Sequence, residues 1–266
     1  MSLKSLFKKS ISKKEELMAG LKGGEYLSDI DNLADQILSN EPILKYRYKD
    51  FDLYINNEVA SIYHITKSTS KMEKLANTCT PTEAGVMFDV GANNGLFSYF
   101  FKIKNPTTHA FLFEADQKLI ACIEKNMLKF EQYTIINKAV SDKDGEISFF
   151  INEESAQTNS IYLEAVLPFS QRDKIREVKV PSVSIDNFIL QHNIASIDVF
   201  KIDIQGSEFA VLNTNPHTLN IIETALVEIC FLMPDTIPLI QLMNSKFTKY
   251  EPIADIIMGA DLKFYN

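Results

Sequence analysis

The stretch that decides the fold is Val86-Met87-Phe88-Asp89-Val90-Gly91-Ala92-Asn93-Asn94-Gly95-Leu96. Its first five residues predict a short buried strand, residues 91–95 a tight glycine turn, and the apolar run that starts at Leu96 a helix. A strand, a glycine turn and a helix in this order form the first unit of a doubly wound α/β sheet. Glycine lets the backbone approach a ligand closely, and the first amides of the helix point toward that ligand.

The acidic residue just before the turn, Asp89, indicates which ligand the turn binds. A carboxylate there repels a pyrophosphate and attracts a cationic amine. S-adenosylmethionine (SAM) carries both an ammonium and a sulfonium group, so we interpret the turn as a binding site for SAM. A nicotinamide-dependent oxidoreductase is the less favoured alternative, because it needs the pattern Gly-x-Gly-x-x-Gly and the middle glycine is absent here.

A second strand and helix are predicted over residues 108–115 and 116–130. Glu114 ends this strand at roughly the separation from Gly91 (about 20 residues) at which an acidic side chain meets ribose hydroxyls. A carboxylate can accept from both hydroxyls at once, so we expect Glu114 to bind the cofactor ribose. Asp116 is predicted to be the N-cap of the helix that follows.

Composition limits the classes of protein to which the chain can belong. With 266 residues, 45% of them hydrophobic, the chain can bury one large core. A net charge of −8 argues against nucleic acid as the main partner, because phosphate binding is driven by clustered Lys and Arg. The cysteines are three and scattered, which predicts neither a disulfide framework nor a zinc site. We expect a soluble cytoplasmic protein without a signal peptide or membrane span.

Three regions are expected along the chain: a basic helical arm over 1–40, a cap of hairpin and helix over 41–80, and the sheet domain over 81–266. In the arm, apolar residues recur at helical spacing between lysines. Such an arm either makes a weak contact with acidic lipid or with a partner protein, or is a frayed terminal helix. A helix is expected over 29–40. In the cap, a strand over 44–55 is expected to turn at Asn56-Asn57 and return over 59–65, before a helix over 70–77. Its tyrosines either pack or stack on a substrate.

The remaining chain predicts further strands and helices of the same sheet. Strands are expected over 134–140, 146–152, 178–185, 197–204 and 224–231, with a closing antiparallel pair over 247–253 and 256–265. Helices are expected after Asp186, which would cap the first of them, after Gln205, and over 238–245. The polar segment 153–172 is the longest predicted loop, and long loops in compact domains are often substrate lids.

Four blocks occur in one order at consistent spacing: residues 88–95, 113–115, 137–145 and 200–208. Together they resemble the FkbM family of SAM-dependent methyltransferases, from about Val86 to the C-terminus. The resemblance implies a class I methyltransferase fold, with a Rossmann-like seven-stranded sheet whose last strand is antiparallel. It also implies methylation of a hydroxyl, on a sugar or glycan or on another small natural product, without naming that acceptor.

The resemblance assigns cofactor contacts to residues of the first three blocks. These are Asp89, Gly91, Asn93, Gly95, Glu114, Ala115, Val140, Ser141 and Asp142. Two positions depart from the family pattern. Ala115 stands where a proline is common, and Gln205 stands in Asp203-Ile204-Gln205-Gly206 where the family usually has Asp-x-Glu-Gly. The lost carboxylate supports an alternative, a non-catalytic module that binds SAM without turnover.

Methyl transfer to an alcohol needs alignment of the acceptor and a base for its proton. Asp203 at the end of the fourth core strand is the expected base, and Glu228 in the fifth strand is the second choice. Lys201 shares strand parity with Asp203, so both face the same side, and Lys201 is the third catalytic candidate. The structural alternatives are that Asp203 only orients the donor or a loop, and that Glu228 pairs with Lys201. Asp203, Glu208 and Glu228 could together bind Mg²⁺, but we expect no metal.

Overall fold

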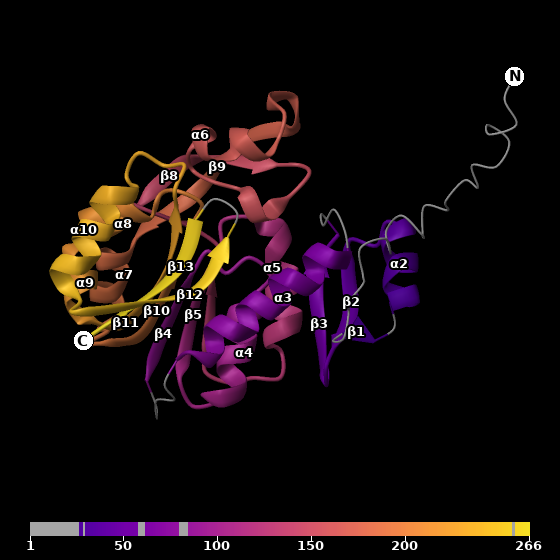
Figure 1. The fold of residues 1–266 in the computed structure, drawn as a ribbon, viewed down its shortest axis with the longest axis horizontal. Helices are drawn as coiled ribbons and strands as arrows, with labels where there is room; N and C mark the ends of the chain where they lie inside the picture. Colours follow the sequence, from indigo (N-terminus) through magenta and orange to yellow (C-terminus); the bar gives the residue numbers. More distant parts are fainter. Residues whose placement is uncertain (1–26, 29, 58–61, 80–84, 257–258) are drawn as a thin grey trace, which may run out of the picture.

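The computed structural model describes residues 27–28, 30–57, 62–79, 85–256 and 259–266. Seven of its strands form one sheet in the order β12-β13-β11-β10-β4-β5-β6 (Figure 1). The bounds are β4 (Val86–Val90), β5 (His109–Phe113), β6 (Tyr133–Ile136), β10 (Ile197–Ile202), β11 (Ile222–Cys230), β12 (Lys249–Ile256) and β13 (Gly259–Tyr265). Neighbouring strands pair in parallel from β6 through β5, β4 and β10 to β11. Strand β13 pairs antiparallel with both β11 and β12. This arrangement confirms the predicted class I methyltransferase fold.

Helices cover both faces of the sheet because its strands alternate between two apolar cores. On β4, Met87 belongs to one core cluster and Phe88 and Val90 to the other. The first face carries α3 (Ile62–Asn77), α4 (Leu96–Lys104) and α5 (Gln117–Met127). The second carries α7 (Ile185–His192), α8 (Glu208–Thr214), α9 (Pro216–Ile221) and α10 (Thr236–Lys246).

A second, three-stranded sheet is inserted between β6 and α7. Its order is β7 (Ala139–Ser141), β9 (Ile175–Ser184) and β8 (Gly145–Asn152). The single strand expected over 134–140 is therefore wrong: the chain turns at Lys138, whose amide donates to Ile136 O at 2.9 Å, and then joins the other sheet. The expected loop 153–172 contains short helices, namely η2 (Ala156–Thr158), α6 (Leu163–Val166) and η3 (Leu167–Phe169), with η4 (Arg172–Lys174) just beyond.

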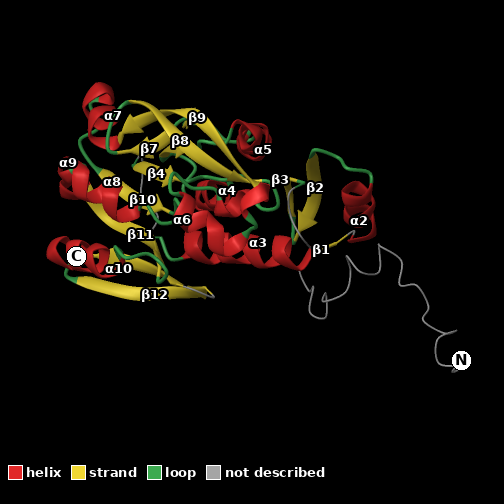
Figure 2. Cartoon of the chain, turned by 90° about the horizontal axis from the view of Figure 1, so that it is seen from above, coloured by secondary structure: helices red, strands yellow, loops and turns green. Residues whose placement is uncertain are grey.

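The N-terminal hairpin differs from the expected one. Its strands are β2 (Ile43–Tyr48) and β3 (Phe51–Asn56), joined through Lys49 at φ 53°, with β1 (Leu27–Ser28) on the outer edge of β2. The predicted return strand over 59–65 is wrong, because α3 already begins at Ile62 and residues 58–61 lie outside the described part. In both views this hairpin lies at one side of the molecule together with α2 (Ile30–Leu38) (Figures 1 and 2).

The hairpin tyrosines are packing residues. Tyr46 and Tyr48 are buried, and their hydroxyls bond to Thr69 and Glu73 of α3 at 2.6 and 2.8 Å. These contacts fix α3 against the hairpin, so that the opposite side of α3 is left to face the sheet edge where the cavity lies.

Two helix caps test local expectations. Asp116 caps α5 as predicted, accepting from the amide of Lys118 at 3.0 Å. Helix α7 is capped by Ser184 and not by Asp186, whose carboxylate instead accepts from the amides of His217 and Thr218. The basic arm falls mostly on residues 1–26, outside the described residues, and stays a prediction. Among the helices described, none combines the length and apolar character that crossing a membrane would require.

Candidate functional site

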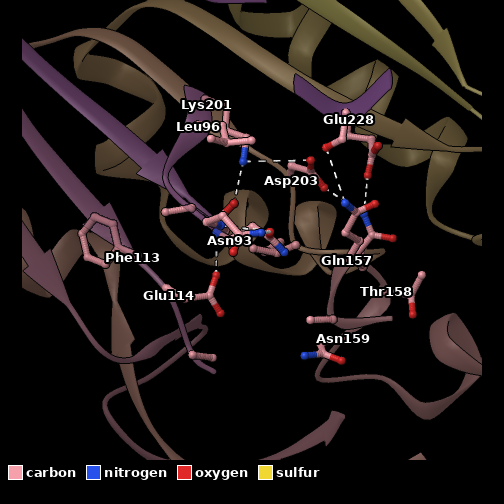
Figure 3. Close-up of a pocket in the computed structure, with 18 of the residues that line it drawn as sticks. Asn93, Leu96, Phe113, Glu114, Gln157, Thr158, Asn159, Lys201, Asp203 and Glu228 are labelled. Atoms are coloured by element: carbon pink, nitrogen blue, oxygen red, sulfur yellow. Dashed lines mark hydrogen bonds and ion pairs between the residues drawn. The ribbon is translucent and has the colours of Figure 1, made fainter. Parts of the chain in front are cut away.

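A cavity of about 530 Å³ opens at the carboxyl ends of the parallel strands. Its walls come from the turns after β4, β5 and β10, from the end of β11, from one side of α3, and from residues 156–159 of the inserted segment. Figure 3 shows Glu114 on one side of this space, Asp203 and Glu228 on the other, and Asn93 between them. Parallel α/β sheets bind ligands at this edge.

The glycine turn is held so close to β10 that only glycine fits its first position. Gly91 has φ 78°, and a Cβ there would lie 1.9 Å from the backbone oxygen of Asp203. Asn93 and Gly95 are also left-handed, at φ 52° and 75°. The first four residues of the turn, Gly91 to Asn94, line the cavity, and α4 begins immediately after the turn, at Leu96.

Glu114 lines the cavity beside this turn. One carboxylate oxygen accepts from the amide of Asn93 at 2.7 Å and the other from the amide of Asp116 at 2.8 Å. Burial raises the pKa of Glu114 to about 7, against the lowering effect of these two amides. Each oxygen keeps a second lone pair for a ligand hydroxyl. Glu114 thus follows β5 and lines the cavity, and its contact with a ribose stays a prediction.

Asp89 does not lie where the sequence placed it. It is fully buried and is not among the residues that line the cavity. Its carboxylate accepts from the Ser98 hydroxyl at 2.6 Å and lies 3.2 Å from the ammonium of Lys201. The expected direct contact between Asp89 and a cationic ligand is therefore corrected: strand alternation turns this side chain onto the face below α4, where it fixes Lys201.

Lys201 connects the glycine turn to the acidic residues. Its ammonium donates to Gly91 O at 2.6 Å and lies 3.9 Å from the Asp203 carboxylate. Burial alone would lower the pKa of Lys201, but the charges of Asp89 and Asp203 outweigh it and the pKa is raised. The Lys201 side chain is therefore a buried positive charge that supports the glycine turn.

Asp203 and Glu228 are joined through a glutamine. The amide nitrogen of Gln205 donates to Asp203 Oδ1 at 2.8 Å and to Glu228 Oε2 at 2.6 Å. Burial would raise the pKa of Asp203, but Lys201 and Lys71 lower it to about 2. Burial and the charge of Asp203 raise the pKa of Glu228 well above its usual value. Asp203 is thus the more readily ionised of the two carboxyls.

The partner of Glu228 is Lys71 of α3, which sequence reasoning missed. The ammonium of Lys71 lies 3.1 Å from Glu228 and 3.1 Å from Asp261, which stand opposite each other on β11 and β13. Burial raises the pKa of Asp261 to about 6. The expected pairing of Glu228 with Lys201 is not found as a close contact, and no local pattern in α3 points to Lys71.

Glu208 is the first residue of α8 and does not line the cavity. Its carboxylate accepts from the amides of Ile204 at 2.9 Å and Gly206 at 3.0 Å. The proposed joint Mg²⁺ site with Asp203 and Glu228 is thus not assembled. In the described part of the chain, no group of three or more His, Cys, Asp or Glu is placed to hold a metal ion.

The other expected cofactor residues divide into two groups. Ala115 and Val140 line the cavity. Gly95, Ser141 and Asp142 do not, since Gly95 faces Ile123, the Ser141 hydroxyl donates to Lys143 O, and Asp142 is exposed. The expected direct contact by these three is corrected accordingly, because the chain leaves the cavity after Val140 of β7 and Gly95 lies against α5.

The inserted segment contributes wall residues that the sequence indicated only as a loop. Ala156, Gln157, Thr158, Asn159 and Ile161 line the cavity. Ser160 anchors the segment, since its hydroxyl donates to Gln205 O at 2.8 Å. These side chains line the cavity, and a lid over residues 153–172 stays a prediction.

Comparison with known proteins gives a family over most of this region. A family model described as "Methyltransferase FkbM domain" matches residues 89–250. The matched range is more than half of the chain and contains the glycine turn, Glu114, and the pair Asp203 and Glu228.

Individual relatives are more distant. The 2-O-methyltransferase NoeI of Sinorhizobium fredii is 25% identical over 142 residues, which are 50% of this chain and 58% of that protein. The chain thus spans little more than half the length of this curated relative. Among solved structures, TYW2 of M. jannaschii in complex with AdoMet has a TM-score of 0.47 at 8% identity, covering 84% of this chain and 85% of that one. TrmK of M. capricolum in complex with S-adenosyl-homocysteine has a TM-score of 0.42 at 14% identity, covering 74% and 67%.

Proposed function

The chain belongs to the FkbM family of methyltransferases, and from this premise we propose that it transfers a methyl group from SAM to a hydroxyl group of a sugar or another small natural product. One observation carries the proposal. One cavity holds Glu114, the acid expected to bind ribose, beside the glycine turn at one end. It holds the pair Asp203 and Glu228 at the other end.

The residues around the turn fit SAM. The backbone of Gly91 leaves no room for a side chain, and the Glu114 carboxylate offers free lone pairs next to it. In the proposal, Glu114 accepts hydrogen bonds from the ribose hydroxyls, while Ala115 and Val140 lie along the adenine ring. When bound, SAM supplies an electrophilic methyl group on a positively charged sulfur.

The chain's own residues then align and deprotonate the acceptor. Asp203 is ionised, so its carboxylate can accept a hydrogen bond from the acceptor hydroxyl and direct an oxygen lone pair toward the methyl group. Gln205 and Lys201 hold that carboxylate in one orientation. Asp203 would take the hydroxyl proton while the methyl–sulfur bond of SAM breaks, leaving SAH, and Gln205 would hold Glu228 beside it.

Two observations support a hydroxyl group as the acceptor. The printed name of NoeI describes a 2-O-methyltransferase, and this chain shares 25% identity with it over 142 residues. The carboxylate pair agrees with such an acceptor, because an alcohol, unlike an amine with a free lone pair, has to lose its proton during transfer.

Isothermal titration with SAM, S-adenosylhomocysteine (SAH) and NAD tests the cofactor assignment. We expect binding of SAM and SAH with one site per chain and no binding of NAD. Binding of NAD alone would establish the oxidoreductase alternative. SAM binding without SAH release in the presence of any sugar or alcohol would instead support the non-catalytic alternative.

A further inference from the structure

The ionisable residues that line the cavity are unequal in number. Five are lysines, at positions 67, 71, 74, 138 and 201, and three are acids, at 114, 203 and 228. This excess of positive charge occurs in a chain whose net charge is −8. A local charge opposite to that of the whole protein is a feature of the cavity and not of the general surface.

The three acids and the two deep lysines that line the cavity all have partners within the protein. Glu114 accepts from two backbone amides, Lys201 lies by Asp89 and Asp203, and Lys71 lies by Glu228 and Asp261. The uncompensated charge at the cavity is therefore positive.

The other three lysines stand at the mouth. Lys67 and Lys74 are exposed and flank Lys71 at helical spacing, so the three share one face of α3. Lys138 is also exposed and comes from the turn between β6 and β7. Lys67, Lys74 and Lys138 form no ion pair with another described residue.

We infer that the acceptor carries an anionic oxyacid group, a carboxylate or a phosphate, which Lys67 and Lys74 bind at the mouth while its hydroxyl reaches Asp203. This inference rests on the proposed function and narrows its substrate class. SAM has two positive groups and one carboxylate, so the cofactor adds no negative charge to a cavity that is already positive. An anionic acceptor completes the balance, and a neutral sugar does not.

Titration of the SAH-loaded protein with matched sugars tests the inference. The probes are glucose, glucuronate and glucose 6-phosphate, followed by calorimetry or by saturation-transfer NMR. We expect glucuronate or glucose 6-phosphate to bind more tightly than glucose, and the stronger of the two identifies the carboxylate or the phosphate. In Lys67→Ala/Lys74→Ala this preference should fall by about two- to fivefold for each lysine removed. It should also weaken as salt is added.

The matched control is Lys104→Ala/Lys179→Ala, which removes two exposed lysines that do not line the cavity and should leave the preference unchanged. If the acids bind no more tightly than glucose, or if both double variants lose the preference equally, the inference is wrong. Tighter binding of a short RNA oligonucleotide than of either sugar acid would also overturn it. Failure of the wild-type protein to bind SAH would overturn the proposed function, whereas SAH binding without an acid preference overturns the inference alone.

Discussion

The ammonium of Lys201 donates a hydrogen bond of 2.6 Å to the backbone carbonyl of Gly91, which ties the glycine turn to the neighbouring strand β10. The same ammonium lies 3.2 Å from the Asp89 carboxylate and 3.9 Å from that of Asp203. The cofactor side and the acid side of the cavity are therefore held by one buried cation, and changes at either side are expected to affect the other.

Replacement of this cation tests its structural role. Lys201→Met leaves Asp89 buried without a counter-ion, which should lower the free energy of unfolding by about 3–5 kcal/mol in urea titrations. Lys104→Met, at an exposed position, should change it by less than about 0.5 kcal/mol. The double variant Lys201→Met/Asp89→Asn should recover part of the loss. A loss below about 1 kcal/mol in the single variant would show that Lys201 is dispensable.

The close approach of the turn predicts an asymmetry between two glycines. Gly91→Ala would place a Cβ 1.9 Å from Asp203 O, whereas Gly145, also at positive φ, has nothing within 4 Å. Both alanine variants carry a backbone cost of about 1–2 kcal/mol, but only Gly91→Ala should also abolish SAM binding in calorimetry. Equal SAM affinity in the two variants would mean that the close packing of Gly91 against Asp203 is not needed for SAM binding.

Glu114 predicts a pH dependence of cofactor affinity. Its pKa is raised by burial to about 7, while its ordinary value is 4.5. Below pH 7 the folded, free protein holds this carboxyl protonated, so binding that needs the carboxylate must release a proton. SAM affinity should therefore weaken by up to about tenfold for each pH unit below 7.

The same raised pKa sets the sign for stability without ligand. Between pH 4.5 and 7 the folded state binds a proton at Glu114 that the unfolded chain has lost, so this contribution to stability falls as pH rises through that window.

Titrations with SAM at pH 6 to 8.5, in buffers of different ionisation enthalpy, measure the proton that is released on binding. The Glu114→Gln variant should bind SAM weakly at every pH. A pH-dependent SAM affinity in that variant would assign the titration to another group.

Asp203 and Glu228 should respond differently to loss of charge. Asp203→Asn removes the ionised base and should reduce kcat by about 100-fold or more. Glu228→Gln keeps a neutral side chain, the form that the raised pKa already favours, so its kcat should fall by about tenfold at most. Full turnover in Asp203→Asn, measured as SAH released, would make the base assignment wrong.

Gln205 is expected to position that base. Loss of its hydrogen bonds in Gln205→Ala should lower kcat by about 10- to 100-fold, since a bond to a charged group contributes about 1.5–3 kcal/mol. In Gln205→Glu a third carboxyl would join the pair, raise its pKa values and move the acidic limb of the pH–rate profile upward. The exposed Gln241 on α10 is the matched position for both changes. Identical pH profiles in wild type and Gln205→Glu would rule out the positioning role.

Much of the fold could be predicted because its signals are local. The glycine turn, the buried strands and the acid at the end of β5 each depend on a few adjacent residues, and the closing pair β12 and β13 follows from its own pattern. The hairpin was misread because the reversal at Lys49 carries no glycine. Tyr46 and Tyr48 before it continue the apolar alternation through the turn.

The errors at the site come from longer range. Asp89 precedes the turn as expected, but its contact with Lys201 depends on the pairing of β4 with β10. Lys71 reaches Glu228 from a helix that is far away in sequence. Such pairs depend on how elements pack, and no pattern within one segment contains that information.

A crystal structure of the protein with SAH tests the central claim most directly. The account predicts the adenosyl group over the turn at Gly91–Asn93, with both ribose hydroxyls within hydrogen-bond distance of the Glu114 carboxylate. SAH bound away from Glu114, or ribose hydroxyls held by other side chains, would contradict it.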